Sequence, residues 1–381
     1  MPSSTSNSEN IAMDTAYQRC PRSGGERVLW LMVFVITVSA LYGWETFLRR
    51  HGHRPTVVDN HALWALQRDR VDSPDSEKTL VCLGDCRMQL GFMPSLVNVQ
   101  QPDFRVVQLA VHESSPMMAL RDLAAHEDFN GIVLCGLTPR EFCDDIWDSQ
   151  QAYVDFYHRQ FGLNVKLNRC VSNWMQCAFT FLHPHVRLDD MFVHWLQNRT
   201  VKNPYYLETR ADRSRLADYS GADLPQQKAW ALGRLDWYLL DRGAVVPSEA
   251  WVEGALRTNA WVQAIQDRGG DVVFVRFPTS GQHLMKEQLG FPRQEYWDAF
   301  AAQTPAYTIH FQDEPTLEYF YCPDTSHLDR RDTPRFTLAL LDILVRDGIL
   351  PDPQIAAPTL PMQRKKPQTE LGGDDFDPFA D

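Results

Sequence analysis

Residues 79–87 read TLVCLGDCR, an apolar run that ends in glycine, aspartate and cysteine. The run from Thr79 to Leu83 has the composition of a strand that is buried on both faces. A stretch with helical character follows it, so we place Cys86 on a turn between a strand and a helix. At such a turn a side chain can stand free above the N–H groups of the helix.

Four further segments have the same short, apolar character and are rich in β-branched residues or leucine. The five predicted strands cover residues 79–84, 105–110, 131–137, 271–277 and 306–311. Helical stretches, at 116–126, 249–267 and 335–345 among others, separate them. This alternation predicts a three-layer α/β/α doubly wound, flavodoxin-like fold around a five-stranded parallel sheet. Ligands of such folds bind at the carboxyl ends of the strands, and Cys86 falls at one of them.

A second short segment, Asp324-Thr325-Ser326-His327, begins 238 residues after Cys86 and directly precedes the last predicted helix. The acid stands three residues before the histidine, close enough for its carboxylate to orient the imidazole. A nucleophile, a base and an orienting acid are the minimum set for acyl transfer. The two segments together therefore indicate a catalytic site made of Cys86, His327 and Asp324.

These two blocks resemble those of the SGNH (GDSL-like) hydrolase and acyltransferase superfamily, and the resemblance covers roughly residues 78–347. The family has Gly-Asp-Ser at the end of its first strand and Asp-x-x-His near its C-terminus; here Cys86 replaces the serine. The resemblance implies an ester hydrolase or O-acyltransferase that acts on an external carbohydrate or cell-envelope polymer. The alternative is a non-catalytic member of the fold that binds glycans or helps to assemble an envelope complex.

The chemistry of Cys86 leaves the same two interpretations open. A cysteine at a helix start next to a histidine is expected to have a lowered thiol pKa, because both favour the thiolate. His327 would then act as the general base and Asp324 would fix its tautomer. Otherwise Cys86 marks a site that has lost its catalytic serine.

The oxyanion hole is the part of the site where the sequence departs from the family. The family uses the N–H of the nucleophile, a glycine after strand two and an asparagine after strand three. Glu113 stands where the glycine is expected, and the third strand runs into Thr138 with no asparagine. Backbone N–H groups of Cys86 and Glu113 and the Thr138 hydroxyl remain as donors. Arg87 either pairs with a carboxylate or holds a substrate, and with Asp85 it completes the set of oxyanion and substrate candidates.

The N-terminal part of the chain contains a charge-free run of 17 residues, from Val28 to Trp44. We predict a disordered tail over 1–27, a membrane anchor over 28–48 and, over 49–77, a linker with one or two helical turns. A cleaved signal peptide, with a cleavage site at residues 38–40, is the alternative. Positive charges are balanced on the two sides, so the external location of the domain follows from the family resemblance alone.

The remaining chain is predicted to form one domain over 78–350, with a helical insertion at about 140–250 that covers the mouth of the site. A disordered acidic tail over 351–381 follows it. The net charge of −12 argues against a nucleic-acid partner, and we expect no metal and no organic cofactor. His183, His185, Asp189 and Asp190 are interpreted as solvated polar residues.

The eight cysteines show no zinc-binding pattern. Cys82 and Cys135 lie in predicted strands and are interpreted as small core residues. Cys170 and Cys177 are seven residues apart, which puts them on one face if this segment is helical. Asn198-Arg199-Thr200 matches the pattern of a glycosylation acceptor.

Overall fold

The computed structural model describes residues 24–72, 78–241 and 246–353, and the chain divides into two compact units, 1–47 and 48–381. The first unit holds most of α1 (Gly24–Arg50), whose most apolar window has a mean hydropathy of 1.7. Its length and composition suit a membrane span or a signal sequence. Residues 24–27, which were predicted to belong to a tail, are helical. The predicted tails at 1–23 and 354–381 lie outside the described residues.

The second unit is built on a five-stranded sheet in which all neighbouring strands are parallel. Its strands are β1 (Thr79–Leu83), β2 (Arg105–Gln108), β3 (Ile132–Leu137), β6 (Asp271–Arg276) and β7 (Tyr307–His310). Their order is β2-β1-β3-β6-β7, the order of a doubly wound flavodoxin-like sheet. The predicted fold class is therefore confirmed, with each strand within a few residues of its predicted range.

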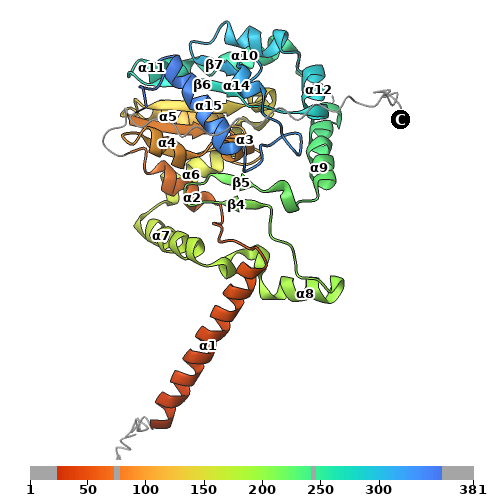
Figure 1. The fold of residues 1–381 in the computed structure, drawn as a ribbon. Coiled ribbons are helices and arrows are strands. Elements are labelled where there is room, and N and C mark those ends of the chain that lie inside the picture. Colours follow the sequence, from red (N-terminus) through yellow and green to blue (C-terminus); the bar gives the residue numbers. More distant parts are fainter. Residues whose placement is uncertain (1–23, 73–77, 242–245, 354–381) are drawn as a thin grey trace, which may run out of the picture. The chain divides into compact units, whose positions relative to one another are not determined.

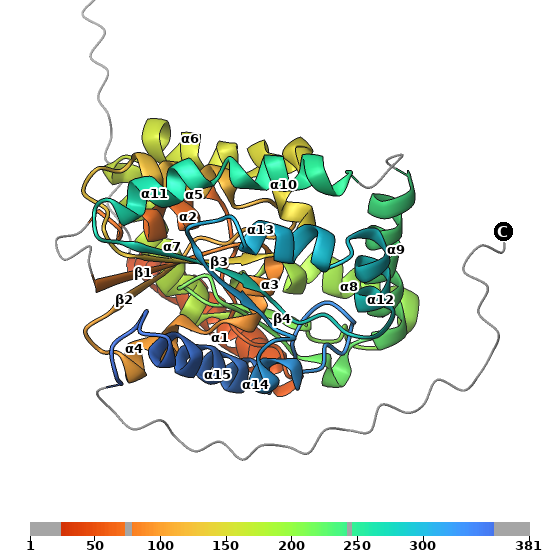
Figure 2. The same cartoon turned by 90° about the horizontal axis from the view of Figure 1, so that it is seen from above.

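Helices cover both faces of the sheet, as the view from above in Figure 2 shows. One face carries α3 (Cys86–Gly91), α4 (Pro94–Gln100), α14 (Pro315–Glu318) and α15 (Thr333–Arg346). The other carries α5 (Met117–Ala125), α6 (Gln151–Gln160), α10 (Ser248–Leu256), α11 (Asn259–Gln266) and the short α13 (Ala299–Ala301). Alternate strand residues enter the two cores, because successive side chains of a strand point to opposite faces. Cys82 and Cys135 are fully buried in opposite cores, as predicted.

Two predicted segments differ from the structure. The single helix expected over 249–267 is interrupted between α10 and α11. There the Thr258 hydroxyl donates to the carbonyl of Ala255 at 2.7 Å and competes with the helical hydrogen bonds. In the predicted linker, 49–77, the expected helical turns are α2 (His61–Arg68), but this helix is packed into the folded unit. Leu63 and Trp64 of α2 are fully buried, so their apolar surface makes this segment part of the folded unit.

The insertion is largely helical, and Figure 1 shows its segments in yellow to green. Besides α6 it contains α7 (Leu163–Ala178), α8 (Leu188–Asn198) and α9 (Leu224–Asp236). Shorter helical turns are η2 (Pro139–Phe142), η3 (Asp144–Gln150), η4 (Thr180–Leu182), η5 (Pro184–Val186), η6 (Tyr219–Gly221) and η7 (Trp237–Asp241). The insertion also contains an antiparallel pair that was not predicted, β4 (Leu207–Thr209) with β5 (Arg215–Ala217). Strands of three residues are too short to show a clear alternation of apolar and polar residues.

After β6 the chain forms three further helical segments before β7 and α14. These are α12 (Gly281–Gly290), η8 (Gln294–Asp298) and α13. Tyr296, Trp297 and Phe300 of this region are buried in the same core as α5, α10 and α11. α12 contributes buried polar residues, His283 and Glu287, which become important for the site described next.

Candidate active site

Cys86 is the first residue of α3 and lies just beyond the carboxyl end of β1, as predicted. The turn that carries it depends on Gly84, whose φ of +144° is a conformation that side chains disfavour. A Cβ at residue 84 would also lie 2.7 Å from the carbonyl oxygen of Gly136 in β3. The side chain of Asp85 caps α3 by accepting a hydrogen bond from the N–H of Arg87 at 2.8 Å. The N–H of Cys86 stands at the first helical position, where no acceptor exists within the helix.

His327 lies in the loop between α14 and α15, and Asp324 shapes that loop. Oδ1 of Asp324 accepts hydrogen bonds from the N–H groups of Ser326 (2.9 Å) and His327 (2.7 Å). Thr325, which directly follows Asp324, has a φ of +77°, a left-handed conformation that costs energy for a β-branched residue. The turn leaves Oδ2 of Asp324 at 2.8 Å from Nδ1 of His327. The acid therefore orients the imidazole across a single turn.

The structure brings Cys86 and His327 together across 241 residues of sequence. Sγ of Cys86 lies 3.0 Å from Nε2 of His327, and Nδ1 of the same ring lies against Asp324. Both side chains are buried, each residue being 7% exposed. Sulfur, imidazole and carboxylate thus form a continuous chain of hydrogen-bond contacts with the geometry that a nucleophile, a base and an orienting acid require.

The charges around this chain favour a thiolate paired with an imidazolium. Burial and the Asp85 carboxylate raise the pKa of the Cys86 thiol, but His327 and a hydrogen bond from His112 outweigh them and lower it to about 6. For His327, burial lowers the pKa of the imidazole, and the charges of Cys86 and Asp324 raise it to about 10. Although Asp324 is buried, the His327 ring and two hydrogen-bond donors hold the pKa of its carboxyl well below the usual range. Each charge thus stabilises the other, which favours the thiolate–imidazolium form of the pair.

Arg87 points into a buried polar network and pairs with carboxylates, which was one of its two predicted roles. Its guanidinium lies 3.0 Å from Oδ2 of Asp85, 3.1 Å from Nε2 of His283 and 3.8 Å from Oε1 of Glu287. Glu287 in turn accepts from Arg276 at 2.5 Å. Asp85 thus serves both as the cap of α3 and as the partner of Arg87. This network fixes the turn beneath the sulfur.

The side-chain oxyanion candidates have other partners. The Thr138 hydroxyl and the Thr138 N–H both donate to Glu141, so the hydroxyl is engaged within its own turn. Burial and the nearby Asp85 carboxylate raise the pKa of Glu141 to about 8. Glu113 has a φ of +55°, the left-handed region that favours the glycine expected there from the family pattern. Its carboxylate pairs with Arg234 (2.9 Å) and with His112 (3.2 Å).

Three residues near the site were not found from the sequence. His112, beyond the carboxyl end of β2, helps to lower the pKa of the Cys86 thiol and stacks on Trp230 with ring centroids 6.5 Å apart. Tyr219 donates its hydroxyl to Oδ2 of Asp324 at 2.7 Å. Gln150 is fully buried and donates to the carbonyl of Gly84 (3.3 Å) and to Ser114 (3.2 Å). Only His112 had a sequence signal, namely its position directly after a predicted strand.

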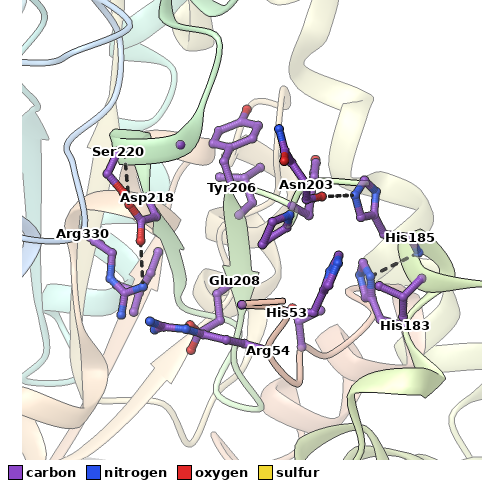
Figure 3. Close-up of a pocket in the computed structure, with 18 residues that line it drawn as sticks. His53, Arg54, His183, His185, Asn203, Tyr206, Glu208, Asp218, Ser220 and Arg330 are labelled. Atoms are coloured by element: carbon purple, nitrogen blue, oxygen red, sulfur yellow. Dashed lines mark hydrogen bonds and ion pairs between the residues drawn. The ribbon is translucent and has the colours of Figure 1, made fainter. Parts of the chain in front are cut away.

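The insertion closes over the site through the β4–β5 pair. Leu207, Ala217 and Tyr219 are buried in one small cluster with Cys86. A cavity of about 290 Å³ lies on the outer side of this pair and does not include Cys86 or His327 among its lining residues. Figure 3 shows His53, His183 and His185 on one side of it and Asp218 and Arg330 on the other.

Tyr206 connects the cavity to the candidate site. It lines the cavity and packs against Tyr219 with ring centroids 5.7 Å apart. Burial, Tyr205 and the Asp324 carboxylate raise the pKa of Tyr206 to about 12. Tyr219, the packing partner of Tyr206, in turn donates its hydroxyl to Asp324, so these two rings link the cavity lining to the acid of the site.

The described part of the chain contains no group of three or more metal-ligating side chains. His183 and His185 line the cavity, whereas Asp189 pairs with Arg187 at 2.8 Å on the surface. Cys170 and Cys177 are both exposed on α7, and the seven cysteines within the described ranges are all free.

Comparison with known proteins adds little beyond this geometry. No protein-family model matches the sequence, and no curated protein matches it. Eight chains of solved structures are similar to this one. Among them is the crystal structure of TesA, which is 12% identical and aligns over 70% of this chain and 97% of its own, with a TM-score of 0.32. At that score the likeness is too weak to carry an argument about the site.

Proposed function

We propose that this chain is an SGNH-like ester hydrolase or O-acyltransferase with Cys86 as its nucleophile. The observation that carries the proposal is the contact chain from Cys86 through His327 to Asp324, with separations of 3.0 and 2.8 Å. The order of the two sequence blocks and the position of Cys86 at the end of β1 support it. The catalytic roles of the three residues are part of the proposal.

In the acylation half of the reaction, the Cys86 thiolate attacks the carbonyl carbon of an ester. The carbon–oxygen bond to the alcohol breaks as a thioester forms, and the His327 imidazolium gives its proton to the departing alkoxide. Asp324 keeps the ring in place through Nδ1 and stabilises its positive charge while that charge exists. The N–H groups of Cys86 and Glu113 are the proposed donors to the tetrahedral oxyanion.

In the second half, neutral His327 takes a proton from water or from an acceptor hydroxyl. The resulting oxygen nucleophile attacks the thioester, the acyl group leaves the sulfur, and the thiolate–imidazolium pair is restored. Water as the acceptor gives hydrolysis, and a sugar hydroxyl gives acyl transfer. Because Thr138 is engaged with Glu141, the site relies on backbone donors, and we expect slow turnover.

A carbohydrate is the proposed substrate class, and the cavity beside the site supports it. Its lining combines aromatic rings (Tyr205 and Tyr206) with polar side chains of both charge signs, including Glu208 and Arg330. Flat rings and convergent polar groups are what a sugar, with its apolar faces and many hydroxyls, requires. With α1 as an anchor, we propose an envelope polymer outside the cytoplasm as the setting.

Trapping of the acyl-enzyme tests the proposal. The full-length chain in detergent is mixed with a chromogenic acetyl ester, quenched in acid and digested, and its peptides are analysed by mass spectrometry. We expect an acetyl group on the peptide that contains Cys86, in a form that hydroxylamine removes as it does a thioester. The same experiment on the His327→Ala variant should show little or no acetyl-Cys86. Absence of the adduct from the wild-type chain, at ester concentrations that acetylate other residues, would contradict the proposal.

The second candidate function is glycan binding without catalysis. The engaged side chains of Thr138 and Gln150 favour it, because neither is free to stabilise an oxyanion. This alternative places the ligand in the cavity of Figure 3 and gives Cys86 no role in turnover. Binding of a polysaccharide with no acyl-Cys86 and no ester hydrolysis would support it over the enzyme.

A further inference from the structure

The insertion helix α7 is amphipathic, and its polar side, not its apolar side, faces the rest of the folded unit. Arg169 is buried and donates to the carbonyl of Val58 at 3.0 Å. Gln176 accepts from the N–H of the same residue at 3.0 Å. Lys166 pairs with Asp69 at 2.5 Å. The side of α7 that faces the folded unit is therefore held by polar contacts rather than by an apolar core.

The opposite side of α7 is apolar and open. Leu163, Leu167, Val171 and Trp174 follow one another at helical spacing, and each is between 57% and 69% exposed. Surface helices of proteins in water normally show the opposite arrangement, with the apolar stripe toward the core. This orientation is the expected one only if the outer face meets an apolar environment.

The next long helix, α8, also exposes apolar side chains. Met191 is its only buried residue, and its exposed apolar residues are Leu188, Phe192, Val193, Trp195 and Leu196, each 45% exposed or more. Trp195 carries the guanidinium of Arg199 over its ring at 5.1 Å. We call the nine exposed apolar residues of the two helices the α7–α8 apolar surface. Exposed apolar helix faces such as these mark a site of interaction.

The position of this surface along the fold indicates what covers it. Arg49, near the last residue of α1, donates to the carbonyl of Ala178 at the end of α7 (2.8 Å). His53 lies 3.1 Å from the carbonyl oxygen of Lys202, four residues after α8. Both helices are thus tied to the residues that directly follow the apolar run of α1. Figure 1 shows α7 and α8 at the same end of this unit.

We propose that α7 and α8 lie in the interface of the bilayer that α1 spans, with the α7–α8 apolar surface inserted below the lipid headgroups. An amphipathic helix with tryptophan and leucine on one face binds membranes in this way. Tryptophans such as Trp174 and Trp195 prefer the headgroup level, and basic residues such as Arg187, Arg199 and Lys202 favour phosphate groups nearby. The proposal does not depend on the catalytic role of Cys86. It would hold the candidate site and its cavity at a fixed height above the membrane.

Quenching of tryptophan emission by brominated lipid tests this arrangement on the full-length chain in nanodiscs. The bromines are placed high on the acyl chains, near the headgroups. The wild type is compared with Trp174→Phe, Trp195→Phe, Trp30→Phe and Trp261→Phe. Trp30 in α1 reports whether the span is inserted. Trp261 is the control, because it lies on α11, which Figure 1 shows at the opposite end of the unit from α7 and α8.

We expect Trp174→Phe and Trp195→Phe to remove lipid-quenched emission, as Trp30→Phe does, and Trp261→Phe to leave it unchanged. If Trp30 is quenched by lipid while Trp174 and Trp195 are quenched only by aqueous iodide, the two helices face water and the proposal is wrong. If Trp174 and Trp195 are shielded from both quenchers, a protein partner or a second copy of the chain covers them, which also contradicts it. Absence of lipid quenching at Trp30 itself would overturn the span and the proposal together.

Discussion

Replacement of Cys86 by alanine is expected to lower the rate of acetyl-ester hydrolysis on the order of 10,000-fold. The alanine removes the atom that forms the thioester, so the covalent route is lost. A large loss is expected because a nucleophile, base and acid act as one unit. The rate should be measured on the full-length chain in detergent, with a chromogenic acetyl ester in excess.

Cys170→Ala is the matched control for this prediction. Cys170 is an exposed free cysteine on α7, so its loss should not change the rate if the reaction belongs to the candidate site. Both variants should retain the thermal unfolding transition of the wild type, since neither change opens a large cavity. Equal hydrolysis by wild type and Cys86→Ala would eliminate the proposed enzyme and leave the glycan-binding alternative.

The second large effect is expected from His327→Ala, measured as the rate at which iodoacetamide alkylates Cys86. His327 is what holds the Cys86 pKa at about 6 against burial and the Asp85 carboxylate. Without the imidazole, only His112 opposes the rise in pKa that burial and the Asp85 carboxylate cause. The pKa of the thiol should then lie at or above its ordinary value of 9.0. At about pH 6.5 the thiolate fraction then falls roughly 100-fold or more, and the alkylation rate falls with it, because the thiolate is the reacting form.

Peptide mass spectrometry resolves this rate for Cys86 separately from the other cysteines. His158→Ala is a suitable control, because His158 is a solvent-facing histidine on α6 that pairs with Asp122. It should leave the Cys86 rate unchanged. A Cys86 rate that is the same in His327→Ala as in the wild type would mean that the 3.0 Å contact does not govern the thiol.

The sheet could be predicted from the sequence because its central strands are buried on both faces. β1, β3 and β6 have every residue or nearly every residue buried, which leaves continuous apolar runs in the sequence. The β4–β5 pair could not be found in the same way, since three-residue strands on the surface carry no such run. The break between α10 and α11 was missed because the apolar spacing continues through it, while a Thr258 hydrogen bond ends the helix.

The two ends of the candidate site could also be predicted, since Cys86 and Asp324–His327 sit in short local turns. The contacts that residues of the insertion make with the site could not be predicted. Tyr219 reaches Asp324 from a segment with no fixed spacing to it, and the Gln150 amide reaches the carbonyl of Gly84 from η3. The contact between Thr138 and Glu141 could have been predicted from the sequence, because Glu141 stands at the third position of a capping box. That pattern accounts for the loss of Thr138 as an oxyanion donor.

The pH dependence of Cys86 alkylation in the wild-type chain tests the central claim most directly. The pKa of the thiol is lowered in the folded chain, so the reactive thiolate exists above that pKa and is lost as the pH falls through it. The account predicts an alkylation rate that rises to a plateau with a midpoint at about pH 6. A midpoint near the ordinary thiol value of 9.0 would show that no thiolate–imidazolium pair joins Cys86 and His327, and it would contradict the account.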